Sequence, residues 1–374
     1  MKTTEDPRIK EFARILVERG AEVEEGDYVY LLSKSLESLP LFEEVRRQII
    51  KKGAYPHEHL LYDSQIGSEG MDHDWMNYSS KEQLKNVSEA KRKEMKNMDC
   101  YIRIGGPDNT QELSGIDSEK SSIRKKSNRE IMNIRFDLKW AATRFPTDGM
   151  AQNAGMPTSE LEEMVIKGVT DVNYDELEQK NQRVKKKFDG AEEVKITGKE
   201  TEITFSLIDR EGISSSGKRN FPDGEVFYAP VKDSVNGKIK FSYPSTLSGN
   251  EVQGIKIWLE DGKIVEYEAD KNREFLADMI GADEGSKYLG EFGIGTNRKI
   301  TEYINSTIPD EKIGGTVHFA IGNAYEECVP EGEERNQSGI HWDIVKDLRP
   351  RAGGGKIIVD GEVIQEDGEW QFEV

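Results

Sequence analysis

The sequence contains very little cysteine: Cys100 and Cys328 are the two in a chain of 374 residues. They lie far apart and form no Cys-x-x-Cys spacing, which excludes a disulfide framework and a zinc site built on thiolates. Such sparse cysteine is typical of a reducing compartment, and we expect the protein to be cytoplasmic.

Long apolar runs are also missing. No stretch approaches the roughly 18 apolar residues that a membrane-spanning helix requires. The opening residues, MKTTEDPRIKEF, carry charges where a signal peptide needs an apolar run. We therefore expect neither a membrane segment nor a membrane partner.

Basic residues are too few to balance the acidic ones. Fifty-two Lys and Arg against 71 Asp and Glu give a net charge of −19, which repels phosphate backbones and argues against nucleic acid as a partner. The chain is 35% hydrophobic and 33% charged, as in a globular protein with an unusually polar surface. Its length favours two domains.

Motifs for phosphate binding and covalent catalysis are incomplete. The stretch Gly212–Lys218 has the spacing of a phosphate loop, but Arg219 stands where Ser or Thr is needed. Pro222 blocks the helix whose N-terminus should bind the phosphate. The chain has no Gly-x-Ser-x-Gly motif, which argues against a serine nucleophile of that kind.

The predicted elements change character near residue 190. Before it, strands alternate with helices, which predicts an α/β domain with a mostly parallel or mixed sheet over residues 1–190. The expected strands cover residues 28–32, 58–62, 100–104 and 140–144, and the expected helices include 41–52, 80–96 and 117–136. The charged stretch 174–187 predicts a solvated helix that connects two bodies.

After this stretch, turn dipeptides such as Asp223-Gly224 and Asn236-Gly237 separate short β-type runs. They predict an α+β domain rich in antiparallel strands over residues 191–374, with helices near 271–280 and 299–304. Together the two halves predict an α/β protein of two domains, and the candidate site residues described below all lie in the C-terminal one.

Histidine is scarce, with five residues in the whole chain, and two of them fall in short β-type runs at 316–321 and 339–345. Because side chains alternate across a strand, His341 and Asp343 point to the same face. Apolar neighbours surround Asp343, so its ionised carboxylate needs a cation or a hydrogen-bonded partner. With His318 nearby in the sequence, this face is a candidate metal site.

His57 and His59 also share a strand face. The only acidic residue between them, Glu58, points to the opposite face, so this pair is a much weaker candidate for a metal site.

Two glutamates complete the stronger candidate set. Glu225 follows the Asp223-Gly224 turn, and Glu291 is flanked by glycines and apolar residues in LGEFGIGTN. Three carboxylates carry −3 and two divalent ions +4, so one hydroxide neutralises the set. Two ions that share a bridging carboxylate and a water can activate that water for amide hydrolysis. Mixed oxygen and nitrogen donors suit zinc, cobalt or manganese.

The motifs NFPDGEVFYAP, YLGEFGIGTN, GGTVHFAIGNAY and SGIHWDIV resemble the thermophilic aminopeptidase family, the dinuclear metallo-aminopeptidases T and S. Further similarity, in WAATRFPTDGMAQNAGMPTSELEE and in the ends of the chain, extends the resemblance over nearly its whole length. It implies a metal-dependent aminopeptidase that acts on peptides and forms a homodimer.

The resemblance also implies residue roles. The expected metal ligands of two divalent ions per chain are Glu225, Glu291, His318, His341 and Asp343. Glu291 is the expected bridge and a catalytic residue, and Tyr325 matches the family's catalytic tyrosine. A phenol at this position can donate a hydrogen bond to the developing oxyanion.

Alternatives remain at this stage. His318, His341 and Asp343 alone form the two-histidine, one-carboxylate set of a mononuclear non-haem iron dioxygenase. An inactive family member is a third possibility. The acidic segment 326–334 is either a solvated loop or the group that attracts the free α-amine of a peptide.

Overall fold

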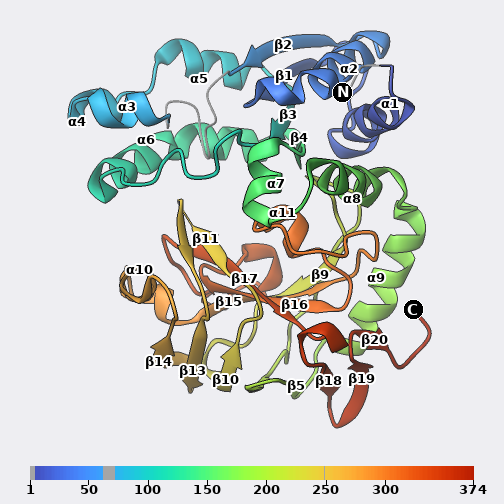
Figure 1. The fold of residues 1–374 in the computed structure, drawn as a ribbon, viewed down its shortest axis with the longest axis vertical. Helices are drawn as coiled ribbons and strands as arrows, with labels where there is room; N and C mark the ends of the chain where they lie inside the picture. Colours follow the sequence, from blue (N-terminus) through green and yellow to red (C-terminus); the bar gives the residue numbers. More distant parts are fainter. Residues whose placement is uncertain (1–4, 62–71, 248) are drawn as a thin grey trace. The chain divides into compact units, whose positions relative to one another are not determined.

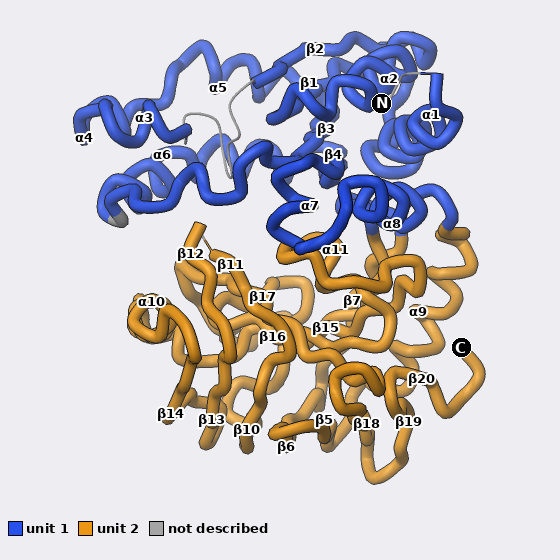
Figure 2. Tube along the Cα trace, in the orientation of Figure 1, with its two compact units in different colours: residues 1–171, 217–222 blue, residues 172–216, 223–374 orange. Residues whose placement is uncertain are grey.

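A computed structural model describes residues 5–61, 72–247 and 249–374. The chain divides into two compact units, which Figure 2 colours separately. The first unit comprises residues 1–171 and 217–222, and the second comprises residues 172–216 and 223–374. Residue 62, the end of the second predicted strand, lies outside the described residues.

The first unit is built on a five-stranded sheet in the order β2-β1-β3-β4-β8, with every neighbouring pair parallel (Figure 1). Its strands are β1 (Tyr28–Ser33), β2 (Tyr55–Leu60), β3 (Cys100–Gly105), β4 (Lys139–Arg144) and β8 (Asn220–Phe221). Parallel neighbours require crossover connections, and helices supply them between the first four strands. The prediction of an α/β unit is confirmed.

The helices of this unit are α1 (Pro7–Arg14), α2 (Leu39–Lys51), α3 (His73–Tyr78), α4 (Lys81–Lys85), α5 (Glu89–Lys96), α6 (Ser118–Asp137), α7 (Asp148–Ala154) and α8 (Thr158–Thr170). A π-helical turn, Ile15–Gly20, extends α1. The single helix predicted over residues 80–96 is wrong. Asn86 has an extended backbone, and its carbonyl oxygen and that of Leu84 accept hydrogen bonds from Arg124 instead of continuing the helix.

The second unit contains two antiparallel sheets and a hairpin. The eight-stranded sheet has the order β14-β13-β10-β6-β5-β18-β19-β20, and the five-stranded sheet has the order β17-β16-β15-β9-β7. The strands of the larger sheet are β5 (Val194–Gly198), β6 (Thr201–Phe205), β10 (Asn236–Lys240), β13 (Lys256–Glu260), β14 (Lys263–Glu268), β18 (Gly355–Val359), β19 (Glu362–Glu366) and β20 (Glu369–Trp370).

The strands of the smaller sheet are β7 (Ile213–Ser215), β9 (Glu225–Tyr228), β15 (Leu289–Gly295), β16 (Thr316–Gly322) and β17 (His341–Asp347), and the hairpin pairs β11 (Ser245–Leu247) with β12 (Asn250–Val252). The helices are α9 (Tyr174–Phe188), α10 (Arg273–Ile280) and α11 (Thr307–Asp310). Short 3-10 turns cover Leu36–Ser38 in the first unit and Lys232–Ser234, Gly285–Lys287, Glu326–Cys328 and Pro350–Ala352 in the second.

The core of the second unit lies between its two sheets. Phe205 of β6 contacts Phe292 of β15 and Phe319 of β16, with ring centroids 4.8 and 5.7 Å apart. All three rings are 2% exposed or less. One face of the five-stranded sheet is therefore dry and apolar, and the polar side chains at alternate positions lie on its other face.

Helix α9 belongs to the second unit, whereas its sequence suggested a connector between two bodies. The Asn181 side chain donates hydrogen bonds to the carbonyl oxygens of Ser215 and Glu225, which ties the helix to strands β7 and β9. The unit boundary lies at residues 171–172, where we had expected it near residue 190.

A helix predicted near residues 299–304 is also wrong. The Ile304 N–H donates to the Asp310 carboxylate, and Asn305 has a left-handed φ of 56°, so the local side chain replaces helical hydrogen bonds.

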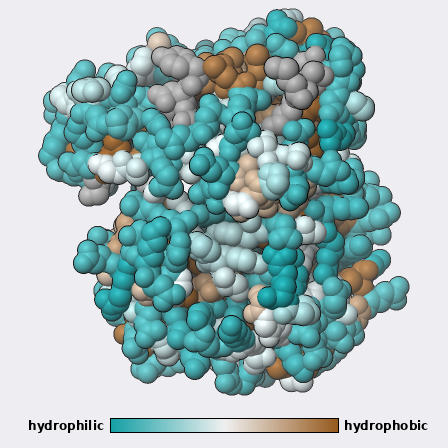
Figure 3. Space-filling model, in the orientation of Figure 1, coloured by the Kyte–Doolittle hydropathy of each residue, from teal (hydrophilic) through white to brown (hydrophobic). Residues whose placement is uncertain are grey.

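None of the described helices is long and apolar enough to cross a membrane. Hydrophilic residues cover most of the face of each unit drawn in Figure 3, in agreement with the charged composition.

Candidate metal centre

The five predicted ligands come from four neighbouring strands of the five-stranded sheet. Glu225 lies on β9, Glu291 on β15, His318 on β16, and both His341 and Asp343 on β17. In each strand the flanking residues, such as Phe292 and Phe319, point into the core. The two-residue period of a strand therefore places all five ligands on the opposite face.

Two glycines make room for this arrangement. Gly290 forms a bulge at which the register between β15 and β16 shifts, so Leu289 and Phe292 both reach the core while Glu291 faces the site. Gly293 pairs with His318 across the strands, and a Cβ atom at Gly293 would lie 2.0 Å from the imidazole ring. Only glycine allows the ring to lie there.

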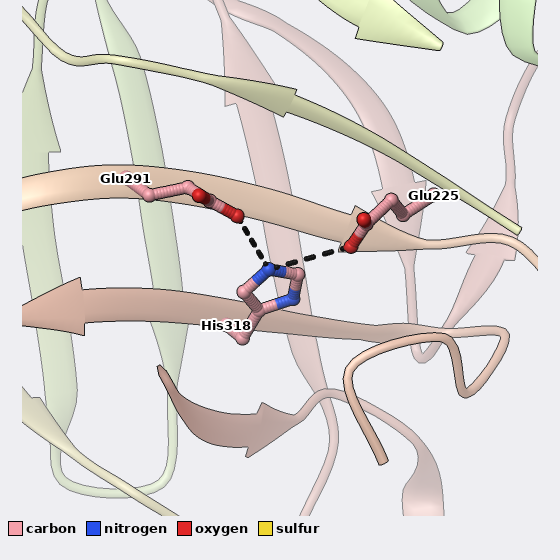
Figure 4. A group of neighbouring side chains, drawn as sticks. All are labelled: Glu225, Glu291 and His318. Carbon is pink, nitrogen blue, oxygen red and sulfur yellow. Dashed lines mark hydrogen bonds and ion pairs between the residues drawn. The ribbon is translucent and has the colours of Figure 1, made fainter. Parts of the chain in front are cut away.

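Glu225, Glu291 and His318 form the first group of neighbouring donor atoms. The His318 Nε2 atom lies 3.0 Å from Oε1 of Glu291 and 3.5 Å from Oε2 of Glu225, so both carboxylates point at one imidazole nitrogen (Figure 4). His318 is fully buried, and the two glutamates are 5–6% exposed. Two carboxylates and an imidazole in a dry site form a strong cation site.

Glu291, His341 and Asp343 form the second group. The His341 Nε2 atom lies 3.5 Å from Oε2 of Glu291 and 3.4 Å from Oδ1 of Asp343. Its Nδ1 donates a hydrogen bond of 2.8 Å to the Asn323 carbonyl oxygen, which leaves Nε2 available as the ligand nitrogen. Glu291 thus directs one oxygen to each imidazole.

Buried donor atoms without hydrogen-bond partners support a cation here. Among the described residues of the site, four buried atoms have no hydrogen-bond partner: Glu225 Oε2, Glu291 Oε2, Asp343 Oδ1 and His318 Nδ1. Leaving such atoms unpaired is costly, and three of them are carboxylate oxygens at the two groups. The residues therefore fit divalent cations.

Lys312 is the first functional residue that the sequence analysis missed. It is fully buried, and its ammonium group donates to the Oε1 atoms of both Glu225 and Glu311. The lysine holds one oxygen of Glu225 and leaves the other facing His318. In the sequence its neighbours Asp310 and Glu311 are acidic, so the local pattern gave no clear signal that this lysine is buried.

Glu311 is the second missed residue. It forms a third group of neighbouring donors with His318 and Asp343, in which the three ligand atoms lie within 4.8 Å of one another. Burial raises the pKa of Glu311 to about 8, and the charge of Lys312 opposes this rise. Divalent ions would favour the ionised carboxylate further.

The metal-free site holds protons on its histidines. Burial lowers the pKa of His318, but its hydrogen bond to Glu291 and the nearby carboxylates outweigh burial and raise it to about 9. Asp343 and Glu291 likewise outweigh burial and raise the pKa of His341 to about 10. Metal binding must displace these protons.

Tyr325 lies beside the second group, next to His341. Its ring centroid is 4.9 Å from that of His341 and 5.7 Å from that of Phe227, and 42% of the residue is exposed. Burial of part of the ring and the charges of Glu291 and Asp343 raise the pKa of Tyr325, so the phenol keeps its proton at neutral pH. It is a hydrogen-bond donor at the rim of the site.

Other histidines lie in a different setting. His59 of β2 contacts Glu94 at 2.8 Å and stacks on Tyr30, with ring centroids 4.1 Å apart. Among the described residues, neither His57 nor His59 belongs to a group of three potential ligands. In the acidic segment 326–334, most of the glutamates are exposed.

Comparison with known proteins covers nearly the whole chain. The model of the family described as thermophilic metalloprotease (M29) matches residues 5–370. Aminopeptidase AmpS of Bacillus subtilis is 26% identical over 98% of both chains. The structure of wild-type AmpT from Thermus thermophilus superposes with a TM-score of 0.78 at 20% identity and covers 98% of this chain and 99% of that one.

A 2,5-dihydroxypyridine dioxygenase from Pseudomonas putida has a more distantly related structure, with a TM-score of 0.57 at 14% identity over 98% of this chain and 97% of that chain. At these identities the two structures support the fold alone.

Proposed function

We propose that this chain, which belongs to the thermophilic metalloprotease family M29, is an aminopeptidase that uses two divalent metal ions to hydrolyse the N-terminal residue from peptides. The family resemblance predicted from the sequence motifs is confirmed by the match over residues 5–370. Two relatives of this chain carry the name aminopeptidase, AmpS of Bacillus subtilis and aminopeptidase T of Thermus aquaticus. Their names support the choice of substrate class.

One observation carries the dinuclear part of the proposal. The two oxygens of Glu291 face two different imidazoles, at 3.0 Å from His318 and 3.5 Å from His341. We propose that Glu225, Glu291 and His318 hold one ion and that Glu291, His341 and Asp343 hold the other. Such a pair lowers the pKa of a shared water towards neutrality and polarises a substrate carbonyl.

The remaining charges agree with this assignment. Glu225, Glu291 and Asp343 carry −3, and the buried pair Glu311 and Lys312 adds no net charge. Two divalent ions leave +1, which one hydroxide neutralises. We propose that Glu291 or Glu225 helps to accept the water's proton and that Tyr325 donates a hydrogen bond to the carbonyl oxygen as negative charge develops on it.

The dioxygenase alternative is less well supported. An iron site of that type needs two histidines and one carboxylate around a single ion. Each group of donors found in the described part of the chain contains one histidine and two carboxylates. None of these groups matches the two-histidine, one-carboxylate set that such an iron site requires.

The homodimer implied by the resemblance stays a proposal. Sedimentation velocity of the purified protein tests it, and a mass of 42.4 kDa, that of one chain, would contradict it.

The proposed activity has a direct test. Protein purified without chelator should contain about two divalent ions per chain. It should cleave aminoacyl anilides, lose this activity on chelation and regain it with zinc, cobalt or manganese. N-acetylated anilides, which lack the free amine, should resist cleavage. Failure to hydrolyse any free-amine substrate with both metals bound would contradict the proposal.

A further inference from the structure

An apolar patch lies on the face of the five-stranded sheet that carries the candidate metal centre. It consists of four side chains: Ile213, Phe227, Tyr325 and Val329. Three of them, all but Tyr325, are half-buried and pack against a small buried cluster of Ala229, Ala324 and Cys328. The Tyr325 ring contacts that of Phe227, with centroids 5.7 Å apart. The apolar patch is therefore one continuous surface.

Strand register fixes where this patch lies relative to the metal donors. Phe227 of β9 pairs with Gly293 of β15, which pairs with His318 of β16, so the three residues form one row with side chains on one face. Neighbouring strands lie about 4.8 Å apart, which puts the backbones of Phe227 and His318 about 10 Å apart. Ile213 of β7 pairs with Phe227 from the other side. The apolar patch thus begins one strand away from a proposed ligand.

The glycine in this row brings the two rings closer. The His318 ring lies over Gly293, where an added Cβ atom would be 2.0 Å from it. The described residues of the row therefore place no side chain between the imidazole and Phe227. Tyr325 borders the second donor group, with its ring centroid 4.9 Å from that of His341. The apolar patch adjoins both proposed ion positions.

Part of the apolar patch is open to solvent. Tyr325 is 42% exposed, and it is one of three exposed large apolar side chains in the described part of the second unit, with Ile208 and Val265. Exposed apolar surface that clusters beside polar donors is typical of a ligand site, in which apolar walls bind a side chain and a few polar groups orient it.

The opposite side of the centre has a different character. The small space beside β17 is lined mainly by polar residues, among them Ser245, Thr246 and Asp310. Hydrocarbon placed against such groups would remove them from water without giving them a hydrogen-bond partner. An apolar group bound at the metal centre is therefore more stable on the β9 side, against Phe227.

We propose that the apolar patch binds the side chain of the substrate's N-terminal residue, so that the enzyme prefers large apolar residues such as leucine at this position. The inference rests on the proposed aminopeptidase function and names its substrate class. The Cβ atom of the N-terminal residue lies two bonds from the carbonyl carbon under attack, so its side chain must lie beside the metal centre. Contact with Phe227 and its neighbours removes apolar surface of both partners from water.

The test compares leucyl anilide with glycyl anilide as substrates of the metal-loaded enzyme. Glycine has no side chain, so its kcat/KM measures catalysis without this contact. We expect the wild type to prefer leucyl anilide by about tenfold or more, and Phe227→Ala to reduce this preference by about tenfold. Phe227→Leu keeps an apolar side chain and should retain most of the preference.

Phe372→Ala is the matched control. This phenylalanine is also half-buried in the second unit, but it packs against Trp370 of β20 in the other sheet. The variant should keep the wild-type preference. Equal losses on leucyl and glycyl anilide in Phe227→Ala would assign Phe227 a structural role and overturn the inference, and so would an unchanged preference.

A second variant covers failure of Phe227→Ala to fold or to bind metal. Val329→Asp places a carboxylate in the apolar patch, and kcat/KM for lysyl anilide relative to leucyl anilide should rise by about tenfold. An unchanged ratio would contradict the inference. Wild-type enzyme that cleaves leucyl and glycyl anilide equally well would contradict the inference alone. Wild-type enzyme that cleaves no free-amine anilide would contradict the proposed function, so the two failures are distinguishable.

Discussion

Strand β2 of the first unit and strand β17 of the second carry the same kind of pattern with different results. Each places two potential ligands two residues apart on one face: His57 and His59 on β2, His341 and Asp343 on β17. Both strands lie at the edge of their sheets, but the neighbours of β2 on β1 are the rings of Tyr28 and Tyr30, which contact its two histidines. Strand β17 continues into β16, β15 and β9, which add His318, Glu291 and Glu225.

The difference shows that spacing within one strand does not make a metal site. Donors must also lie in register on the neighbouring strands. Asp343 pairs with Ala320, which in turn pairs with Glu291, so the two carboxylates lie in one row across three strands. Two small residues, Ala320 in this row and Gly293 opposite His318, leave space for the donors.

Removing the shared carboxylate should give the largest effect. Glu291→Gln weakens both groups at once, and we expect aminopeptidase activity to fall by about 10⁴-fold or more, the scale for a central catalytic group. Metal analysis should find fewer than two ions per chain. His59→Gln is the matched change on β2 and should leave both quantities unchanged. Equal losses of activity and metal in Glu291→Gln and His59→Gln would contradict the claim that the metal site lies on the sheet of β17 and not on β2.

Lys312→Met removes the buried cation between Glu225 and Glu311. Two buried carboxylates then lack compensation, so the free energy of unfolding of the metal-free protein should fall by about 3–5 kcal/mol. Urea denaturation measures this change. The double variant Lys312→Met with Glu311→Gln should recover part of the loss. Unchanged stability in the single variant would show that the pair makes no net contribution.

Tyr325→Phe should cut turnover by about 10²–10³, the usual effect of losing one oxyanion donor. Its metal content should match the wild type, since no ligand changes. Loss of metal together with activity would instead assign the tyrosine a structural role. On β2, Tyr55→Phe is the control, because this tyrosine is exposed and its strand contributes to none of the groups of three potential ligands found among the described residues.

Metal affinity should depend on pH, because His318 of β16 and His341 of β17 must lose a proton to bind an ion. Because His318 and His341 have pKa values of about 9 and 10 in the metal-free protein, each ion displaces a proton below these values. Affinity should rise with pH, by about tenfold per pH unit for each histidine, until the pH passes 9. Competition with a chelating indicator between pH 6 and 8 measures the slope, and a flat profile would contradict the assignment of either histidine.

Gly293→Ala should give the smallest effect. The added Cβ atom displaces the His318 ring, and overpacking of this kind typically costs about 1–3 kcal/mol. The change should appear as weaker binding of one ion, with the second bound normally. Weakening of both ions to the same degree would mean that the distortion spreads beyond His318.

Much of this architecture follows from the sequence because it depends on strand period and composition. The alternation of strands and helices predicted the parallel sheet, and the i, i+2 pattern on β17 indicated the face on which His341 and Asp343 lie. The family motifs added Glu225, Glu291 and Tyr325, which no local pattern could bring together.

What the sequence did not predict depends on contacts between distant segments. Glu311 and Lys312 lie after the short helix α11, outside any strand, and reach Glu225 only through the folded chain. The Asn323 carbonyl that orients His341 is a backbone group with no residue signature. Gly293 has a clear role only once its register with His318 is known.

Anomalous scattering at the zinc edge from crystals of the zinc-loaded protein tests the central claim most directly. We predict two peaks about 3.5–4 Å apart on either side of the Glu291 carboxylate, one bound by His318 and the other by His341. A single peak bound by both histidines, or two peaks that do not share Glu291, would contradict the account.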